Sequence, residues 1–563
     1  MLTSHRLPLQ SVDQLARGGG DDAVLARLND GQFSARLVAL RALLDEVAGR
    51  SLLLEIDEAW DLLVLAQRKS PGLVRQVLML PQVGAWLTDV LRRLRGTMKS
   101  AEPLWVEVGH LRCVAAAAAH LCDIDFSLDV PVSRGVISLP SLGIAAVPVS
   151  SHWAVARAEA HAGRLSLFCG EHAVRVPEDE NWSPVHRVVS GDFRPLLDDV
   201  EPHRDYRAKV PPLRLTDIEI ERWARGLDEA RVLLGKEYVS ALTAMVTTVV
   251  PVAPANDGTP YSGSSADAYG AVLLSEPPDS TAFAETLAHE VQHTKLAALM
   301  TMEPLYTASG NAYCYAPWRE DPRPLSGLYQ GAYAFLGVTD FWRAHRLAAP
   351  SGRADFEFAY WCGQTTHATR FLRGRRELTP LGRRFATIMA ARLKPWNRIK
   401  VCAAAGLAAR LAALDHRATW RARHLTPDPA GVSHLADLFL AGHQRPPGEL
   451  PPSTLSPGPA PPLPRIELRR RRFHTLENAQ VPAATDADLL HVAGDQEGAT
   501  RLYLADIGIR PDDAAAWIGL GLADPAARTV LRAPEVVMAV HAEVARRTGE
   551  FPDPRAIAAW VGR

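Results

Sequence analysis

Two histidines and a glutamate stand at a spacing suited to metal chemistry near the middle of the chain. The segment His289-Glu290-Val291-Gln292-His293 has the pattern HExxH. Residues four apart on a helix share a face, so the imidazoles of His289 and His293 can bind one ion. Glu290 stands beside them, where it can polarise metal-bound water, hydrogen-bond a ligand imidazole or bind the metal itself. The pattern fixes only three residues and also occurs by chance, so its surroundings decide its meaning.

Those surroundings predict a buried helix. The apolar run Gly270–Leu274 predicts a buried strand, and Pro277–Ser280 predicts a turn that ends in a capping residue. The helix is then expected from Thr281 to Met300. Both of its faces are largely apolar, and one of them carries the two histidines. This pattern predicts a helix that presents two imidazoles in a water-poor cavity.

Hydrophobic spacing divides the whole chain into regions. Helical spacing dominates from residue 11 to 122 and returns over 217–249 and 280–441, whereas short apolar runs over 128–176 predict strands. The proline-rich segment 445–465 predicts an extended linker that can neither continue a helix nor fill a sheet. We therefore expect an α+β, predominantly helical protein with these parts: a helical N-terminal region (1–125), a strand-rich region (126–200), an HExxH metal-binding catalytic region (201–444), the Pro-rich linker (445–465) and a small tetratricopeptide-like helical C-terminal domain (466–563).

The C-terminal part carries a spacing signal of its own. Ala499, Tyr503, Pro511 and Trp517 follow one another in a register similar to that between adjoining tetratricopeptide repeats. Such helix pairs bind peptides or proteins, and a short stub can equally be a helical cap on the main domain. The four arginines 469–472 could touch an acidic partner or nucleic acid, although a solvated interdomain face is the favoured interpretation.

Composition limits the possible partners and compartments. Among 563 residues, 62 Lys and Arg nearly balance 63 Asp and Glu, so no overall charge favours nucleic acid or an anionic membrane, and we expect neither as a partner. The hydrophobic share of 47% and the length suit two or three domains. Six cysteines without a CxxC pair predict reduced thiols and a cytoplasmic location. The alanine run 115–119 is far too short to span a bilayer.

Several further motifs accompany the HExxH segment, in this order: Leu197–Pro202 (LDDVEP), Ser264–Val272 (SSADAYGAV), Leu287–His293 (LAHEVQH), Tyr315–Pro324 (YAPWREDPRP), Gly327–Phe335 (GLYQGAYAF) and Leu378–Arg383 (LTPLGR). In these motifs the stretch from about Asp198 to Arg384 resembles bacterial HExxH-motif proteins associated with ribosomally made, modified peptides. That family is regarded as 2-oxoglutarate-dependent peptide β-hydroxylases. The C-terminal segment also looks similar to full-length members, so the resemblance is expected to reach the end of the chain.

The resemblance implies a reaction and its cofactors. It implies a non-haem Fe(II) site that binds 2-oxoglutarate and O₂, decarboxylates this co-substrate and hydroxylates a side-chain β-carbon in a ribosomally made precursor peptide. The expected partners are that peptide and a further peptide-modifying enzyme of the same pathway. His289 and His293 supply two of the three protein ligands that such a site needs.

The third ligand is open among several residues. The resemblance points to Gln330, whereas Asp340, Glu320 and Asp321 are chemically stronger donors. Asp340 follows Gln330 by ten residues on an expected helix from Leu328 to Arg343, and the two side chains project about 80° apart, so both are expected to approach a single centre. We rank Gln330 first.

A co-substrate with two carboxylates needs a cationic anchor. Arg319 and Arg323 lie in a proline-punctuated loop, and an arginine fork grips a carboxylate through two hydrogen bonds. We favour co-substrate binding for at least one of them, with pairing to Asp321 or Glu320 as the alternative. Other residues near the site are expected to pack rather than to bind: Trp318 as an anchor, His345 and His367 as surface or core residues, and Tyr315, Tyr329 and Tyr333 as pocket lining or core.

Two other functions fit the same segment. In a zinc metallopeptidase, Zn²⁺ replaces iron and Glu290 acts as general base on the bound water. The paired arginines are unexplained in that interpretation, and no glutamate or histidine follows at the short spacings of common peptidases. In a non-catalytic binding module, the segment 486–563 would recruit a peptide or a partner enzyme. The oxygenase is the favoured interpretation.

Overall fold

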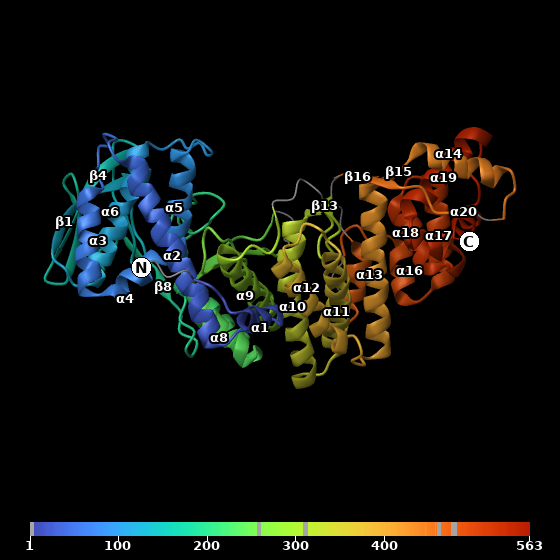
Figure 1. The fold of residues 1–563 in the computed structure, drawn as a ribbon, viewed down its shortest axis with the longest axis horizontal. Helices are drawn as coiled ribbons and strands as arrows, with labels where there is room; N and C mark the ends of the chain where they lie inside the picture. The colour runs from blue at the N-terminus through green and yellow to red at the C-terminus, as the bar shows by residue number, and fades with distance from the viewer. Residues whose placement is uncertain are drawn as a thin grey trace. The chain divides into compact units, whose positions relative to one another are not determined.

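The computed structural model describes residues 5–255, 260–307, 313–444, 446, 448–456, 458, 463–473 and 481–562. The protein is mixed α+β and mostly helical, with 57% of its residues in helices, which confirms the predicted class. The chain forms two compact units, Met1–Pro304 (unit 1) and Leu305–Arg563 (unit 2). Figure 1 labels their elements along the chain. The boundary falls inside the predicted region 201–444, whose integrity as one domain stays a prediction.

Unit 1 begins with six helices, as the spacing over 11–122 predicts. They are α1 (Leu9–Ala16), α2 (Asp22–Val47), α3 (Asp57–Lys69), α4 (Pro71–Leu78), α5 (Pro81–Leu94) and α6 (Leu104–Leu121). The alanine run 115–119 belongs to α6 and is completely buried. Because alanine side chains are small, they let α6 approach the neighbouring sheet closely.

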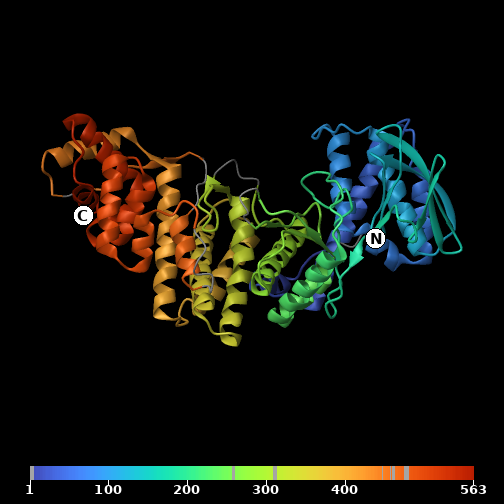
Figure 2. The ribbon, with the colours of Figure 1, turned by 180° about the vertical axis from the view of Figure 1, so that it is seen from behind.

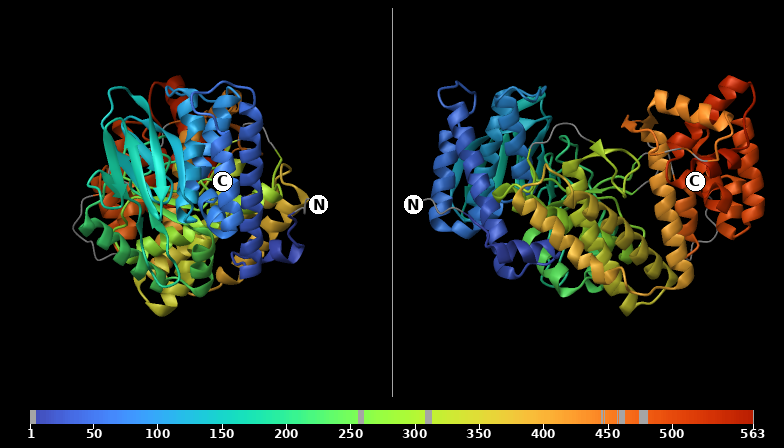
Figure 3. Two further views of the ribbon diagram at one scale, coloured as in Figure 1. Left: turned by 90° about the vertical axis from the view of Figure 1, so that its left-hand side faces the viewer. Right: turned by 45° about the vertical axis from the view of Figure 1, so that its right-hand side comes forward.

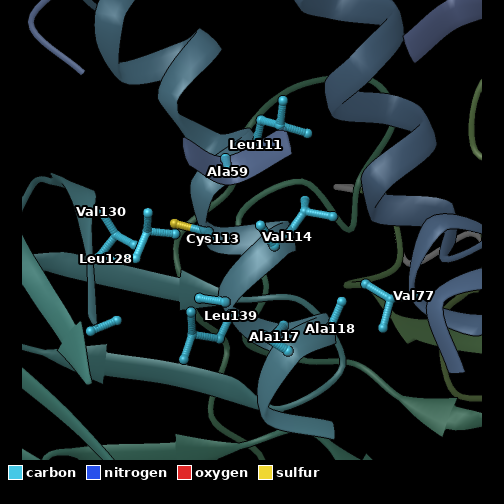
Figure 4. Close-up of a cluster of buried hydrophobic side chains, with 14 of the residues drawn as sticks. Ala59, Val77, Leu111, Cys113, Val114, Ala117, Ala118, Leu128, Val130 and Leu139 are labelled. Carbon is cyan, nitrogen blue, oxygen red and sulfur yellow. The ribbon is translucent and has the colours of Figure 1, made fainter. Parts of the chain in front are cut away.

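The sheet beside α6 is antiparallel and seven-stranded, in the order β6-β5-β4-β1-β2-β3-β7. Its strands are β1 (Phe126–Ser133), β2 (Val136–Leu139), β3 (Gly143–Ala146), β4 (Trp153–His161), β5 (Arg164–Cys169), β6 (His172–Val176) and β7 (Trp182–Pro184). Cys113, Val114 and Ala117 of α6 and Leu128 and Leu139 of the sheet are members of one buried cluster (Figure 4). Figure 3 (left) shows the strands alongside the blue helices. The predicted strands over 128–176 are confirmed.

A second sheet in unit 1 leads to the HExxH helix. Its order is β11-β12-β10-β9-β8, formed by β8 (His186–Arg187), β9 (Leu196–Leu197), β10 (Thr248–Pro251), β11 (Ser262–Gly263) and β12 (Ala271–Leu274). The three central strands are parallel, whereas β8 and β11 pair antiparallel at the edges. Between β9 and β10 lie helices α7 (Asp217–Leu233) and α8 (Lys236–Met245).

The strand β10 corrects the sequence analysis, which extended helical spacing to Val249. Residues Thr248, Val249 and Val250 are buried and pair with β12, and Thr248 and Val249 also pair with β9 on the other side. A run of β-branched residues buried on both faces is typical of a central parallel strand. Its apolar residues are consecutive, so helical spacing cannot be distinguished from a buried strand over such a short run.

Unit 2 consists mainly of helices, and four long ones lie next to one another. After the ribbon of β13 (Tyr313–Cys314) and β14 (Arg323–Pro324) come α10 (Leu325–Ala348), α11 (Gly352–Arg373), α12 (Pro380–Trp396) and α13 (Ala403–His424). These four helices run side by side in Figures 1 and 2. The rest comprises β15 (Leu425–Pro427), α14 (Pro429–Leu440), β16 (Ser453–Leu455), α15 (Pro464–Arg471), α16 (Asp486–Ala493), α17 (Gln496–Ile509), α18 (Ala514–Ala523), the 3₁₀ helix η1 (Pro525–Leu531), α19 (Pro534–Thr548) and α20 (Pro554–Val561).

The proline-rich segment is not entirely a linker. Within it, Ser453–Leu455 forms β16 and pairs antiparallel with Leu425–Pro427. The segment therefore does take part in a sheet, contrary to the sequence analysis, because three consecutive residues without proline retain the N–H groups that pairing needs. Nearby, α17 and α18 form a helix pair in which Trp517 Nε1 donates to Pro511 O at 2.8 Å. Whether this pair acts as a tetratricopeptide-like binding surface stays a prediction.

The arginine run 469–472 is not a solvated face. Arg469 is 3% exposed and pairs with Asp415 at 3.0 Å. Arg470 pairs with Glu357 at 2.6 Å, Arg471 pairs within its own helix, and Arg472 donates to the carbonyl of Val492. Arg469 and Arg470 hold α15 to other helices of unit 2, because their carboxylate partners lie on α13 and α11, which local sequence does not reveal. None of the helices in the described ranges has the length and apolar character needed to cross a bilayer.

Candidate metal centre

The HExxH segment lies on a long helix, α9 (Ser280–Met302), directly after strand β12. Asp279 caps the helix by accepting a hydrogen bond from the amide of Ala282 at 2.7 Å. The predicted helix from Thr281 to Met300 is therefore correct to within two residues at either end. Helices α2, α7 and α8 pack against α9, and Trp223 of α7 meets the ring of Phe283 edge to face at 5.8 Å. This packing fixes the helix inside unit 1.

The two histidines point their Nε2 atoms at each other. These atoms are 3.1 Å apart, and the ring planes meet at 70°. With a metal–nitrogen distance of about 2.1 Å, two nitrogens 3.1 Å apart subtend about 95° at a shared ion. That angle lies between those of square and tetrahedral coordination. The distance between the two nitrogens is therefore compatible with one shared metal ion, and it also suits an N–H···N hydrogen bond between the two rings.

The protonation state of His289 also suits metal binding. Burial, followed by the charge of His293, lowers the pKa of His289 well below its ordinary value. His289 is therefore neutral at physiological pH, and the neutral imidazole is the form that binds metals.

Glu290 is engaged by two serines. Ser262 Oγ donates to Glu290 Oε1 at 2.8 Å, and Ser264 Oγ donates to Oε2 at 2.7 Å. Ser262 lies in the edge strand β11 and Ser264 directly follows it, and residues two apart in extended chain share a face. Glu290 is 1% exposed. Both carboxylate oxygens are thus used to hold β11 against α9, an arrangement we call the serine clasp.

A pair of tyrosines completes the polar surroundings of the clasp. The hydroxyls of Tyr206 and Tyr261 lie 3.3 Å apart, and a Cβ on Gly263 would meet them at 2.5 and 2.9 Å. A larger residue at position 263 would therefore have to displace the tyrosine hydroxyls. Burial raises the pKa of Tyr206, and the charges of Tyr261 and Glu290 add to the effect. Ser264 belongs to the SSADAYGAV motif and Ser262 lies outside it, and the sequence alone predicted no role for either serine.

The other side of α9 is tied to the loop between α1 and α2. Gln292 Nε2 donates to Gly18 O at 3.0 Å, and Lys295 Nζ donates to Gly18 O at 2.6 Å and Gly19 O at 3.3 Å. Lys295 is 3% exposed, so carbonyl oxygens compensate for part of the cost of burying its charge. Sequence analysis gave neither residue a role. Two consecutive glycines at 18 and 19 were a visible signal of close backbone approach.

The LDDVEP motif forms a buried polar cluster elsewhere in unit 1. Asp198 accepts hydrogen bonds from the amide of Glu201 at 2.9 Å and from the side chain of Gln82. Glu201 accepts from Ser138 at 2.9 Å and lies 3.8 Å from His110 Nε2. Burial raises the pKa of Glu201 to about 7 and lowers that of His110 to about 3. At neutral pH the His110 imidazole is therefore uncharged, and the cluster holds the first sheet and α6 to the start of the second sheet.

The two candidate co-substrate arginines lie in unit 2 at the β13–β14 ribbon. Arg319 Nε lies 2.8 Å from Asp321 Oδ1, and Arg323 lies 3.1 Å from Asp321 Oδ2. The alternative that sequence left open, pairing with Asp321, is therefore present for both. Each guanidinium keeps further N–H groups, so their role as co-substrate anchors stays a prediction. Glu320 is exposed, and its backbone carbonyl lies 2.7 Å from His424 Nε2.

Helix α10 carries Gln330 and corrects one expectation about the third ligand. Because α10 is a single helix, Asp340 lies about 15 Å further along the axis than Gln330, at 1.5 Å per residue. At this separation the two side chains cannot both approach one metal ion. The angle between them, on which the expectation was based, does not include the rise of the helix. Asp340 instead pairs with Arg343 at 2.8 Å. Gln330 stays the first prediction for the third ligand.

Trp318 is a packing residue, as expected, and Tyr329 and Tyr333, which could have lined a pocket or filled the core, are buried. Trp318 stacks on Phe335 with ring centroids 4.9 Å apart and lies over Gly331, where any Cβ would overlap its ring. Tyr329 is buried and donates to Gly382 O at 2.9 Å, and Tyr333 is buried. Three motifs of unit 2 therefore meet through contacts that hold the fold together. His345 and His367 make ring contacts with Phe341 and Tyr315, respectively, as the core interpretation predicts.

The structure divides the predicted site residues between the two units. His289, Glu290 and His293 belong to unit 1, whereas Arg319, Arg323 and Gln330 belong to unit 2. Within the ranges that the structure describes, no group of three or more His, Cys, Asp and Glu side chains is arranged to hold a metal. The site predicted from the sequence has only two such side chains, His289 and His293, because its third ligand is the amide of Gln330. Comparison with models of known protein families and with curated proteins gives no match for this chain.

Proposed function

We propose that the protein is a non-haem Fe(II)- and 2-oxoglutarate-dependent oxygenase that hydroxylates a side-chain β-carbon in a ribosomally made peptide. The observation that carries the proposal is the convergence of His289 Nε2 and His293 Nε2 at 3.1 Å. These two residues would hold the iron, with Gln330 as third ligand. Arg319 and Arg323 would bind 2-oxoglutarate. When bound, the iron would supply oxygen activation coupled to decarboxylation of the co-substrate.

The serine clasp favours an oxygenase over a metallopeptidase. A peptidase needs Glu290 as a general base within reach of metal-bound water. Here both oxygens of Glu290 accept hydrogen bonds from Ser262 and Ser264, and the side chain is 1% exposed. An oxygenase of the proposed type needs the two histidines and has no need of a base at this position. In an oxygenase, Glu290 would be a positioning residue. The catalytic role predicted for Glu290 is the one that a peptidase would require.

Residues of this chain prepare the histidine pair for binding. The clasp fixes one side of α9, and Gln292 and Lys295 fix another side to the loop at Gly18 and Gly19. These contacts hold the helix in place, so the backbone positions from which the two imidazoles project are fixed before any metal binds. All six cysteines are free thiols, which fits the reducing cytoplasm in which we place the protein. The expected partners are the peptide substrate and a second enzyme of the same pathway.

Anaerobic reconstitution tests the proposal. Purified full-length protein receives Fe(II) and then 2-oxoglutarate, and the weak visible metal-to-ligand charge-transfer band is recorded. The band should appear in the wild type and be absent from His289→Ala and His293→Ala. The matched control is His434→Ala, which removes an exposed histidine on α14 and should leave the band unchanged.

Other outcomes of this experiment point to the other functions. Arg319→Ala and Arg323→Ala should keep iron affinity and raise the 2-oxoglutarate concentration needed for half of the band by at least tenfold. Iron that binds without any band, or tight binding of zinc alone, would overturn the oxygenase and favour a metallopeptidase. Absence of any metal binding by the wild type would leave the non-catalytic peptide-binding module as the better account.

A further inference from the structure

A cavity of about 560 Å³ lies in unit 1, away from the metal helix. Its lining includes Leu196 at the start of β9, Thr247 before β10 and Gly270 before β12. These three strands are parallel, so the cavity lies at the edge of the sheet where they begin. Helix α9 follows the opposite end of β12, and none of its residues lines the cavity. Ligand sites typically have volumes of roughly 300–1,000 Å³.

The cavity combines an apolar floor with a basic rim. Leu80, Leu196 and Val246 line it with side chains that belong to the core of unit 1. Three arginines line the same space, Arg75 from α4, Arg187 from the edge strand β8 and Arg194 from the loop before β9. A ligand for such a site needs both an apolar group and negative charge.

The positive charge of the rim is balanced only in part from within the fold. Arg75 pairs with Asp30 at 2.7 Å. In contrast, Arg187 donates to the backbone carbonyl of Arg194 at 2.9 Å, and within the part of the chain that the structure describes neither of these two arginines forms an ion pair. Asp192 is the one carboxylate among the lining residues. Arg187 and Arg194 therefore present guanidinium forks that suit carboxylates of a ligand.

The cavity also offers hydrogen-bond acceptors. Residues Thr243, Ala244 and Met245 form the C-terminal end of α8 and line it. The last carbonyls of a helix accept hydrogen bonds from donors outside the helix, and Asn29 already donates to that of Ala244 at 2.8 Å. A ligand with N–H donors, carboxylates and an apolar side chain matches all three features. A peptide segment with acidic and apolar residues has this combination.

We propose that this cavity, here called the arginine cavity, binds an acidic segment of a peptide. Side-chain carboxylates of the peptide pair with Arg187 and Arg194, and an apolar side chain rests on the floor at Leu196. The site is independent of the proposed iron chemistry, because it uses no residue of α9. It gives the protein a way to hold a peptide at a place other than the one where a reaction occurs.

Fluorescence anisotropy with the full-length protein tests the proposal without any metal. The probe is a fluorescein-labelled peptide, Gly-Glu-Leu-Glu-Glu-Leu-Glu-Gly, compared with the same peptide carrying glutamine in place of every glutamate. The wild type should bind the acidic probe at least tenfold more tightly than the glutamine probe. The double variant Arg187→Gln/Arg194→Gln should lose at least tenfold in affinity for the acidic probe.

A matched double variant controls for net charge. Arg164→Gln/Arg175→Gln removes two exposed arginines from the neighbouring strands β5 and β6, outside the cavity, and should stay within twofold of the wild type. Equal binding of both probes, equal losses in both double variants or no binding by the wild type would overturn the proposal. Complete displacement by an equal concentration of free 2-oxoglutarate would also overturn it, since a small dicarboxylate would then be the occupant. All variants alter exposed side chains, and circular dichroism verifies that they fold.

Discussion

Replacing Asp415 by asparagine should destabilise the C-terminal helices of unit 2 far more than the same change at an exposed site. Asp415 lies on α13 and is 1% exposed. Its two oxygens bind Arg465 at 2.9 Å each, and Arg469 adds a third contact at 3.0 Å. Arg465 also pairs with Asp488 of α16 at 2.9 Å. One buried network therefore links α13, α15 and α16.

The expected loss follows from burial and charge. Removing one partner of a buried ion pair costs about 3–5 kcal/mol, because the remaining charges stay buried without compensation. Burial alone would raise the pKa of Asp415, but the charges and hydrogen bonds of Arg465 and Arg469 outweigh it and lower the pKa to about 2, from an ordinary 3.8. That difference corresponds to about 2.5 kcal/mol of stabilisation. Since the folded pKa is the lower one, the stabilisation is complete above about pH 4 and is lost as the pH falls toward 2.

Hydrogen exchange measured by mass spectrometry on the full-length protein resolves this effect locally. At pH 7, amides of α13, α15 and α16 in Asp415→Asn should lose roughly 100-fold in protection, which corresponds to about 3 kcal/mol. The control is Asp437→Asn on α14, whose partner is Arg547 and whose side chain is 65% exposed. An exposed pair contributes about 0–1 kcal/mol. Equal losses in the two variants, or unchanged protection of α13 and α15, would refute the reasoning.

Two further predictions concern the clasp on α9 and the glycines of unit 2. Glu290→Gln should keep the charge-transfer band, and loss of the band in this variant alone would assign the glutamate a direct role at the metal. Ser262→Ala/Ser264→Ala leaves a buried carboxylate without donors and should lower the free energy of unfolding by roughly 2 kcal/mol or more. Gly382→Ala places a Cβ against the backbone carbonyl of Leu305 and should cost more than about 3 kcal/mol in thermal unfolding. Gly363→Ala, which meets nothing within 4 Å in helix α11, should be neutral or stabilising, and similar effects at the two positions would contradict the packing account.

Local patterns predicted the helix that carries the histidines. The caps, the apolar spacing and the preceding strand lie close together in sequence, so the bounds of α9 followed to within two residues. The N-terminal helices and the strands over 128–176 followed for the same reason. Local sequence patterns do not show which residue from a distant segment a side chain will contact. Ser262 reaches Glu290 across 28 residues, and Arg469 reaches Asp415 across 54.

Two predictions were wrong because each used only one geometric feature of the chain. The comparison of Gln330 with Asp340 used the angle between side chains and omitted the rise of the helix, which separates them by about 15 Å. The assignment of Val249 to a helix used spacing alone, although a short apolar run fits a buried strand equally well. Both errors concern geometry rather than composition, so the α+β, mostly helical class was unaffected by them.

The motifs around the HExxH segment differ in what they can say about function. Trp318 needs a glycine at 331, and the hydroxyl of Tyr329 needs the carbonyl of Gly382, so packing of unit 2 accounts for these residues without any reaction. Asp198 and Glu201 likewise satisfy backbone amides inside unit 1. The two imidazole nitrogens meet at 3.1 Å on partly exposed side chains, a distance that suits an N–H···N hydrogen bond between the rings as well as a shared metal ion. In the proposed function, metal binding by this pair is the property on which the reaction would depend, and the serine clasp is the feature that favours an oxygenase over a peptidase.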